Sequence, residues 1–254
     1  ILIAADGVFN HGSALGGGAR IYILDTGVRT SHADFGGRAR GGWSYGCQTG
    51  HEAACSSGAW LHEGRVEGSS GASCSSHGTH CASIAAGSTH GVAKAAEVVS
   101  VQVLTCTGTG SAATIIAGIV WAVDHAARNP DAHGVLSASI GGGYSHAENN
   151  AVNAAHAAGV SVVVAAGNEA EDACRSSPAS APQAITVGAT NAGDWVASFS
   201  NFGSCVDLYA PGQSILAAVA DSDTATSFKS GTSMATPFVA GAVAQIRGVR
   251  PLSY

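Results

Sequence analysis

The chain has 254 residues, of which 46% are hydrophobic and 11% are charged, and its formal net charge is -6. This length fits one large domain or two small ones, and the hydrophobic share is enough to build a sizeable core. A mildly acidic chain lacks the basic surface that attracts nucleic acid or acidic membranes, so we expect neither as a partner. No apolar run approaches the length needed to cross a bilayer.

The chain starts at Ile1 with neither a basic leader nor a methionine, which we interpret as a processed or trimmed product. Its seven cysteines stand among few charged residues. Such usage favours an oxidising compartment and leaves one thiol unpaired, so we expect a secreted protein.

Short β-branched runs bounded by glycine alternate with segments of helical periodicity. Strands are expected at 19–27, 96–104, 133–143 and 159–168, with strand-like segments at 183–190, 205–212 and 213–220. Helices are expected at 77–87, 114–127, 147–159 and 233–246. The alternation predicts an α/β fold with a mostly parallel central sheet flanked by helices on both faces. Residues 46–76, rich in Gly and Ser, predict a long surface loop.

Three polar residues stand where these elements meet: Asp25 closes the first strand, His77 opens the first helix, and Ser233 opens the last helix. In open α/β sheets such residues gather at the carboxyl edge of the strands. A serine hydroxyl becomes a strong nucleophile when an imidazole takes its proton and a buried carboxylate orients that imidazole. Asn168, at the end of another strand, and the Ser233 backbone amide are suited to bind an oxyanion.

Taken singly, each of these residues has an ordinary structural alternative. Ser233 is a suitable helix N-cap. Asp25 and Asn168 are common turn residues. His77 is compatible with a cap or a surface position. The catalytic interpretation depends on their joint occurrence.

Four motifs, "DTGV" at 25–28, "HGTHCAS" at 77–83, "AAGN" at 165–168 and "GTSMATP" at 231–237, together resemble the subtilisin-like serine proteases. The resemblance is closer to the proteinase K type, particularly its aqualysin-like members, and runs from about residue 18 to residue 245. It implies a three-layer subtilisin-like fold. It also implies a catalytic triad of Asp25, His77 and Ser233, an acyl-enzyme on Ser233, and an oxyanion hole formed by Asn168 and the Ser233 amide.

The resemblance further implies that a peptide substrate is held as an added strand between two segments, at 139–143 and 108–112. The implied substrate-binding residues are Gly108, Thr109, Gly110, Ala112, Ser139, Ile140, Gly141, Gly142, Ala166 and Gly167. Main-chain pairing explains a broad specificity, and the resemblance implies a serine endopeptidase of protein substrates that prefers apolar or aromatic P1 residues. The chain is then a single catalytic domain over 1–254, shortened at both ends, monomeric, folded with a propeptide, and without a catalytic cofactor.

Two disulfides are implied by the resemblance, Cys74–Cys106 and Cys174–Cys205. By elimination, Cys47 and Cys55 would form a third pair. Cys81 is then a free thiol, either buried and inert or a catalytic partner of His77. The inert role is favoured, because the "HGTHC" motif of the proteinase K type accompanies a serine nucleophile.

A structural calcium ion is also implied, with Asp207 and the carbonyls of Pro182 and Ala184 as ligands. The alternative is that Asp207 caps a turn. His80, one helical turn from His77, is expected to be structural rather than a metal ligand. For the His–Glu pairs at 51–52 and 62–63, solvated loop positions are preferred to a zinc site.

Three positions depart from the family pattern. Phe238 replaces a histidine and is expected to affect packing rather than chemistry. Ser76 replaces a glycine before His77, so the backbone angles at this position do not follow from the family pattern. Ala112 replaces an aromatic residue and predicts an open S4 subsite.

Two other functions remain alternatives to a protease: a non-catalytic relative that binds peptides or a partner in the same groove, and an esterase that uses the same triad.

Overall fold

The computed structural model describes residues 15–45, 65–67 and 75–249. The main sheet contains β1 (Ala19–Asp25), β2 (Ala39–Tyr45), β3 (Arg65–Glu67), β4 (Glu97–Gln102), β5 (His133–Ala138), β7 (Ser161–Ala165), β9 (Ile185–Thr190) and β10 (Leu208–Pro211). These eight strands lie in the order β10-β9-β7-β5-β1-β4-β2-β3. Seven are parallel, and β3 pairs antiparallel with β2. Two small antiparallel pairs lie outside it, formed by β6 (Gly142–Gly143) with β8 (Ser176–Ser177) and β11 (Ile215–Ala218) with β12 (Thr226–Lys229).

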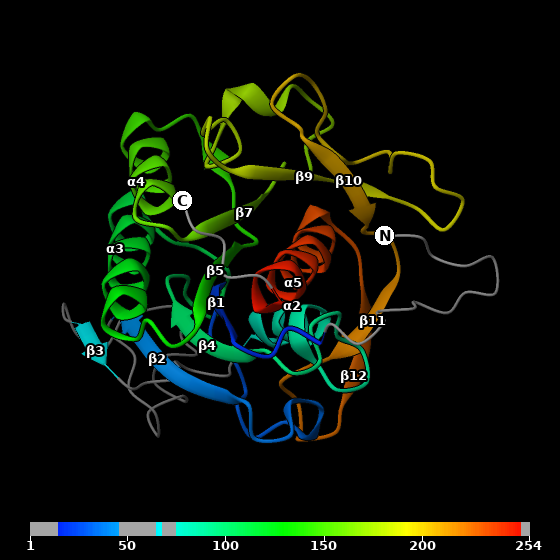
Figure 1. Cartoon of the computed structure of the whole chain (residues 1–254). Helices are drawn as coiled ribbons and strands as arrows, with labels where there is room; N and C mark the ends of the chain where they lie inside the picture. The colour runs from blue at the N-terminus through cyan, green and yellow to red at the C-terminus, as the bar shows by residue number, and fades with distance from the viewer. Residues whose placement is uncertain (1–14, 46–64, 68–74, 250–254) are drawn as a thin grey trace.

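Four α-helices cover the sheet in the described part of the chain: α2 (Ser76–Ala86), α3 (Ala112–Arg128), α4 (His146–Ala157) and α5 (Thr232–Val249). Short 3-10 helices occupy Ala33–Phe35 and Ala173–Arg175. Helices α3 and α4 lie on one side of the sheet and α2 and α5 on the other (Figure 1). The predicted α/β architecture of three layers is therefore confirmed. Among the described residues, no helix is both long enough and apolar enough to cross a membrane.

Strand β1 is the centre of the core because all seven of its residues are buried. Successive side chains of a strand point to opposite faces. Ile21 and Ile23 accordingly pack in the cluster that contains the small residues of α2 and α5. Tyr22 and Leu24 pack in the cluster of α3 and α4. Both helix layers are thus held against the strand that ends at Asp25.

Several segments differ from the sequence-based expectation. Within the predicted loop at 46–76, Arg65–Glu67 forms β3 and Ser76 begins α2, while 46–64 and 68–74 lie outside the described residues. Strands β2 and β12 were not predicted. The segment at 108–112, which the resemblance implies is an edge strand beside the substrate, contains no strand: the chain forms an irregular loop until α3 begins at Ala112.

Ser76 adopts a helical position, and its hydroxyl accepts a hydrogen bond from the Ala220 amide at 3.0 Å. A serine before His77 is therefore compatible with the start of α2. Phe238 lies on α5, half-buried, and packs against a small cluster that includes Cys81, Ile84 and Met234. Its surroundings are those of a packing residue.

His80 is fully buried on α2 and connects this helix to the β11–β12 hairpin. Its Nε2 lies 3.1 Å from the Ile215 carbonyl oxygen and 3.0 Å from the Ser227 carbonyl oxygen. Burial lowers the pKa of His80 to about 4. These contacts give His80 a structural role, as expected, and the group of potential metal ligands found among the described residues does not include it.

This lowered pKa predicts a loss of stability in acid. The unfolded chain, with an ordinary histidine pKa near 6.5, binds more protons than the folded chain between pH 6.5 and 4. The contribution of His80 is present above pH 6.5 and is lost as the pH falls through the folded value. We expect protonation of His80 to lower the free energy of unfolding by about 3 kcal/mol between pH 7 and pH 4. Urea unfolding of wild type and His80→Gln at several pH values between 7 and 4 measures this contribution, as the difference between their dependences of unfolding free energy on pH. The same dependence in both proteins would contradict the prediction.

The packing of Phe238 predicts that Phe238→His lowers the free energy of unfolding by about 1–2 kcal/mol, because a polar ring replaces an apolar one in a half-buried site. Phe228→His is the matched control, since Phe228 is 66% exposed. We expect the control to change stability by less than about 0.5 kcal/mol. Equal effects of the two substitutions in chemical denaturation would show that Phe238 does not stabilise the core.

Candidate active site

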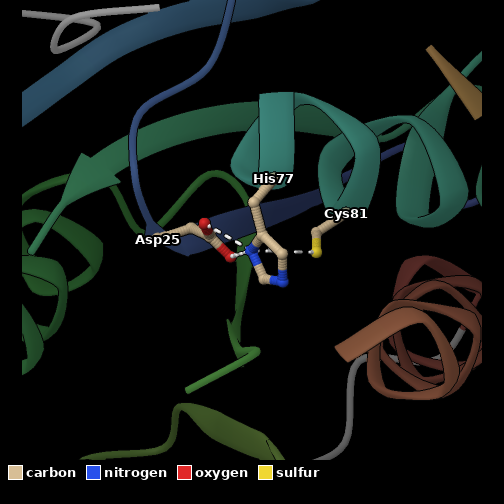
Figure 2. Close-up of side chains that lie close together, drawn as sticks. All are labelled: Asp25, His77 and Cys81. Atoms are coloured by element: carbon tan, nitrogen blue, oxygen red, sulfur yellow. Dashed lines mark hydrogen bonds and ion pairs between the residues drawn. The ribbon is translucent and has the colours of Figure 1, made fainter. Parts of the chain in front are cut away.

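Asp25 and His77 form a close pair at the carboxyl end of β1. His77 Nδ1 lies 2.8 Å from Asp25 Oδ1 and 2.9 Å from Oδ2 (Figure 2). Asp25 is fully buried, and its Oδ1 also accepts a hydrogen bond from the Thr26 amide at 2.6 Å. The negative charge of Asp25 raises the pKa of His77 well above its ordinary value, against the opposing effect of burial. The pair therefore directs a proton to Nδ1 and leaves Nε2 as the basic nitrogen.

The absence of a side chain at Gly78 allows α2 to approach β1 closely enough for this pair to form. A Cβ atom at Gly78 would collide with the Gly27 carbonyl oxygen and lie 3.1 Å from Asp25 Cβ. The Gly78 amide donates to Thr26 Oγ1 at 3.1 Å, and the Ser75 hydroxyl caps α2 by accepting from the His77 amide. The start of the helix is thus fixed directly against the end of the strand.

Ser233 is the second residue of α5, so it lies inside the helix rather than at its N-cap. Its hydroxyl donates to the Ser139 carbonyl at 3.4 Å, and in the described structure no hydrogen bond joins it to His77 Nε2. The Ser233 carbonyl accepts from Ser139 Oγ at 2.9 Å and from Cys81 Sγ at 3.3 Å. Long serine–histidine contacts are common in substrate-free enzymes of this chemistry and shorten in the substrate complex.

Asn168 follows β7 and lies beside the start of α5. Its Oδ1 accepts from the amide and the hydroxyl of Thr232, at 2.8 and 3.1 Å, so its Nδ2 is directed elsewhere as a donor. Gly231 has a φ of 152°, and a Cβ atom there would lie 3.6 Å from the Ser233 amide nitrogen and 3.8 Å from Asn168 Nδ2. The two donors therefore border a space that is kept free of side-chain atoms, a geometry suited to an oxyanion.

Two pockets adjoin this group. A pocket of about 540 Å³ is lined by His77, by 108–110 and by 139–141, and a second, of about 280 Å³, by 141–143, 165–167 and four further residues. These four are Glu169, Glu171, Arg175 and Ser176. The substrate-binding residues expected from sequence thus line the two pockets, with one exception.

Ala112 is the exception: it is an exposed residue at the start of α3 and lines neither pocket. The loop before it is shaped by the hydroxyls of Thr105, Thr107 and Thr109, which form mutual hydrogen bonds, rather than by pairing with a strand. The three charged residues of the smaller pocket were not predicted, because they follow the "AAGN" motif in the sequence without being part of it.

A disulfide joins Cys174 to Cys205, with Cα atoms 5.3 Å apart. Cys106 is also disulfide-bonded, while Cys47, Cys55 and Cys74 lie outside the described residues.

Cys81 is a free, buried thiol next to the Asp25–His77 pair (Figure 2). Burial raises the pKa of its thiol, which disfavours the reactive thiolate. Its Sγ lies 3.9 Å from His77 Nδ1, the nitrogen already engaged by Asp25. These features oppose a role for Cys81 as a nucleophile.

The residues expected to hold calcium line one pocket of about 210 Å³, which includes Pro182, Ala184 and Asp207. Asp207 Oδ2 accepts from the Thr186 amide at 2.8 Å, which leaves Oδ1 for another partner. A carboxylate and backbone carbonyls are oxygen donors of the kind that calcium prefers, so the residues present fit this ion.

The sequence profile of the subtilase family of peptidases matches residues 16–252. An extracellular serine proteinase of Thermus sp. (strain Rt41A) is 45% identical over 239 residues, which cover 94% of this chain and 52% of that protein. A cuticle-degrading serine protease of Arthrobotrys oligospora is 43% identical over 235 residues, or 91% of this chain and 52% of that protein. A crystal structure of a cold adapted subtilisin-like serine proteinase superposes with a TM-score of 0.81 at 40% identity, covering 95% of this chain and 79% of that one.

The chain spans about half the length of these two curated relatives. The family profile nevertheless covers nearly all of it, and the structural similarity covers 95% of it. The chain belongs to the subtilase family.

Proposed function

We propose that the chain is a serine endopeptidase in which Asp25, His77 and Ser233 form the catalytic triad. The observation that carries the proposal is the 2.8 Å contact between a fully buried Asp25 and His77, next to the first turn of α5 that presents Ser233. Relatives named as serine proteases support the same chemistry.

In this mechanism His77 Nε2 takes the proton of Ser233 Oγ as that oxygen attacks the carbonyl carbon of the scissile peptide bond. The hydroxyl exchanges its long contact with the Ser139 carbonyl for one with His77. Asn168 Nδ2 and the Ser233 amide stabilise the negative charge that develops on the substrate oxygen. The buried charge of Asp25 stabilises the positive imidazolium formed at this stage.

Collapse of this tetrahedral intermediate breaks the peptide bond, and His77 donates its proton to the leaving amine. The acyl-enzyme on Ser233 is then hydrolysed by water, with His77 again acting as base. No cofactor takes part in these steps.

The pockets suggest how a substrate is held. Segments 108–110 and 139–141 both line the larger pocket, where an extended peptide would be bound through its backbone. Such binding supports broad specificity for proteins or peptides. An apolar or aromatic P1 side chain would enter the smaller pocket, whose 141–143 and 165–167 walls consist only of glycine and alanine residues.

Secretion, a monomeric state and a propeptide that assists folding are part of the same proposal. Secretion is supported by the similarity to the extracellular serine proteinase of Thermus sp. and by the Cys174–Cys205 disulfide.

We also propose that Asp207, together with the carbonyls of Pro182 and Ala184, binds a structural calcium ion. When bound, the ion would fix the 179–184 segment to the start of β10 by electrostatic attraction. It has no part in the chemical step.

The first prediction of this proposed function concerns the nucleophile. Ser233→Ala should abolish labelling by a fluorophosphonate and lower casein hydrolysis by about 10⁶-fold, the scale known for subtilisin itself rather than a value derived for this chain. Ser230→Ala is the matched control and should behave as wild type, because within the described part of the chain the Ser230 hydroxyl forms a hydrogen bond with the Ser214 amide alone. A well-folded wild type that is not labelled would instead favour a peptide-binding protein. Hydrolysis of simple esters without hydrolysis of casein would favour an esterase.

The second prediction concerns calcium. Removal of the ion with a chelator should lower the melting temperature of the Ser233→Ala protein by about 5–10 °C, as expected for an ion present at about 100 times its Kd. Asp207→Ala should melt at the lower temperature with or without the chelator. If calorimetry shows the same transition of the Ser233→Ala protein with and without the chelator, the site is refuted.

A further inference from the structure

Asn201 is a fully buried residue in the long connection between β9 and β10 (191–207), outside both pockets. All the hydrogen-bonding groups of its side chain are used, and all of them bind the segment that follows β7. Oδ1 accepts from the amides of Glu169 and Glu171, both at 3.0 Å. Nδ2 donates to the Ala166 carbonyl at 2.9 Å and to Glu169 Oε2 at 2.8 Å.

The backbone of Asn201 binds the same segment, since its amide donates to the Gly167 carbonyl at 3.0 Å. Residues on both sides of Asn168 are therefore attached to one buried side chain. Glu169 Oε2 also accepts from the Asn168 amide at 2.9 Å, which connects Asn168 itself to the network. Gly167 has a φ of 105°, and a Cβ atom there would collide with Asn201 Nδ2.

Two functional parts of the proposed site depend on this segment. One is the oxyanion donor Asn168. Thr232 orients its side chain, while its backbone amide is held by Glu169, which Asn201 binds in turn. The other is the wall of the smaller pocket, to which Ala166, Gly167 and Glu169 contribute. A single amide side chain thus fixes the oxyanion donor and the P1 wall relative to each other.

We propose that Asn201 is a positioning residue that holds Asn168 and the P1 wall in their productive geometry; this inference rests on the proposed function. An oxyanion donor contributes fully only when held within about 0.5 Å of its productive position, and a misplacement of about 1 Å costs on the order of 10²-fold in rate. A buried amide with all its hydrogen bonds formed is suited to this precision, because any shift of the segment breaks several bonds together.

A double-mutant cycle in kcat tests this inference, with Asn201→Ala, Asn168→Ala and the double variant assayed on one peptide substrate. All rates are divided by the concentration of active sites, titrated with a fluorophosphonate. We expect Asn168→Ala to lower kcat by about 10²–10³-fold, a scale taken from subtilisin, and Asn201→Ala to lower it by about 10–10²-fold. In the Asn168→Ala background, Asn201→Ala should lower kcat by less than about threefold, because the donor through which it acts is already gone.

Gln245→Leu is the matched control. Gln245 is a buried amide on α5 that donates to the Val92 carbonyl at 2.7 Å, far along the helix from Ser233. Its substitution should lower the melting temperature and leave kcat per active site unchanged. The ratio of kcat/KM between P1 lysine and P1 methionine substrates gives a second readout. It should change in Asn201→Ala, because Glu169 lines the P1 pocket, and should not change in the control.

A reciprocal exchange keeps the test decisive if Asn201→Ala folds poorly. Asn201→Asp retains the acceptor for the two amides but places a second carboxylate against that of Glu169, so the two repel each other. Adding Glu169→Gln restores a hydrogen bond in which residue 169 donates and residue 201 accepts. We expect Asn201→Asp to lower kcat and the double variant to have a kcat at least threefold higher than Asn201→Asp.

The possible results separate the two levels of the proposal. A wild type without titratable sites, or an Asn168→Ala variant with unchanged kcat, would overturn the proposed function. With these intact, multiplicative effects of Asn201→Ala and Asn168→Ala, or a kcat unchanged in Asn201→Ala, would overturn the role of Asn201 alone. If no Asn201 variant yields titratable sites, Asn201 determines folding and the positioning role is rejected.

Discussion

The buried carboxylate of Asp25 is the constraint on which the rest of the site depends. A charge removed from water costs several kcal/mol unless it is paired and hydrogen-bonded. Here the Thr26 amide and His77 Nδ1 supply those partners. Both helix layers must pack tightly on β1 to keep water from Asp25, and α2 must approach its end without a side chain at residue 78. The small residues of α2 and α5 are thus a requirement of the electrostatics as well as of the core.

Much of this arrangement was predictable from the sequence, for a physical reason. Parallel strands place their carboxyl ends along one edge, so Asp25, Ser139 and Asn168 meet once β1, β5 and β7 are recognised as strands. The amino ends of α2 and α5 follow from the motifs around His77 and Ser233. Strand β2 was not predicted because its "ARGGWSY" sequence contains no β-branched residue, and its position is set by pairing with β4.

The residues that sequence reasoning missed share a different property. Asn201, Glu169 and Glu171 are not joined by a regular spacing or by one element. Their relation arises only when the connection before β10 folds back against the segment after β7, through hydrogen bonds between residues 30 to 35 positions apart. An asparagine in a connecting segment has an ordinary local explanation. Only its burial and its four side-chain bonds distinguish it, and both are properties of the folded chain.

Each side chain proposed for catalysis is oriented by a residue from another element. Asp25 of β1 orients His77 of α2, Thr232 of α5 orients Asn168, and Ser139 after β5 binds the carbonyl of Ser233. No single element contains enough of the site to act alone. Its geometry therefore depends on the relative positions of β1, β5, β7, α2 and α5, which the core fixes more firmly than any one loop does. This arrangement explains how a chain so poor in charged residues keeps the Asp25 carboxylate fully buried beside a partly exposed His77: the packing of the whole sheet holds the two side chains together.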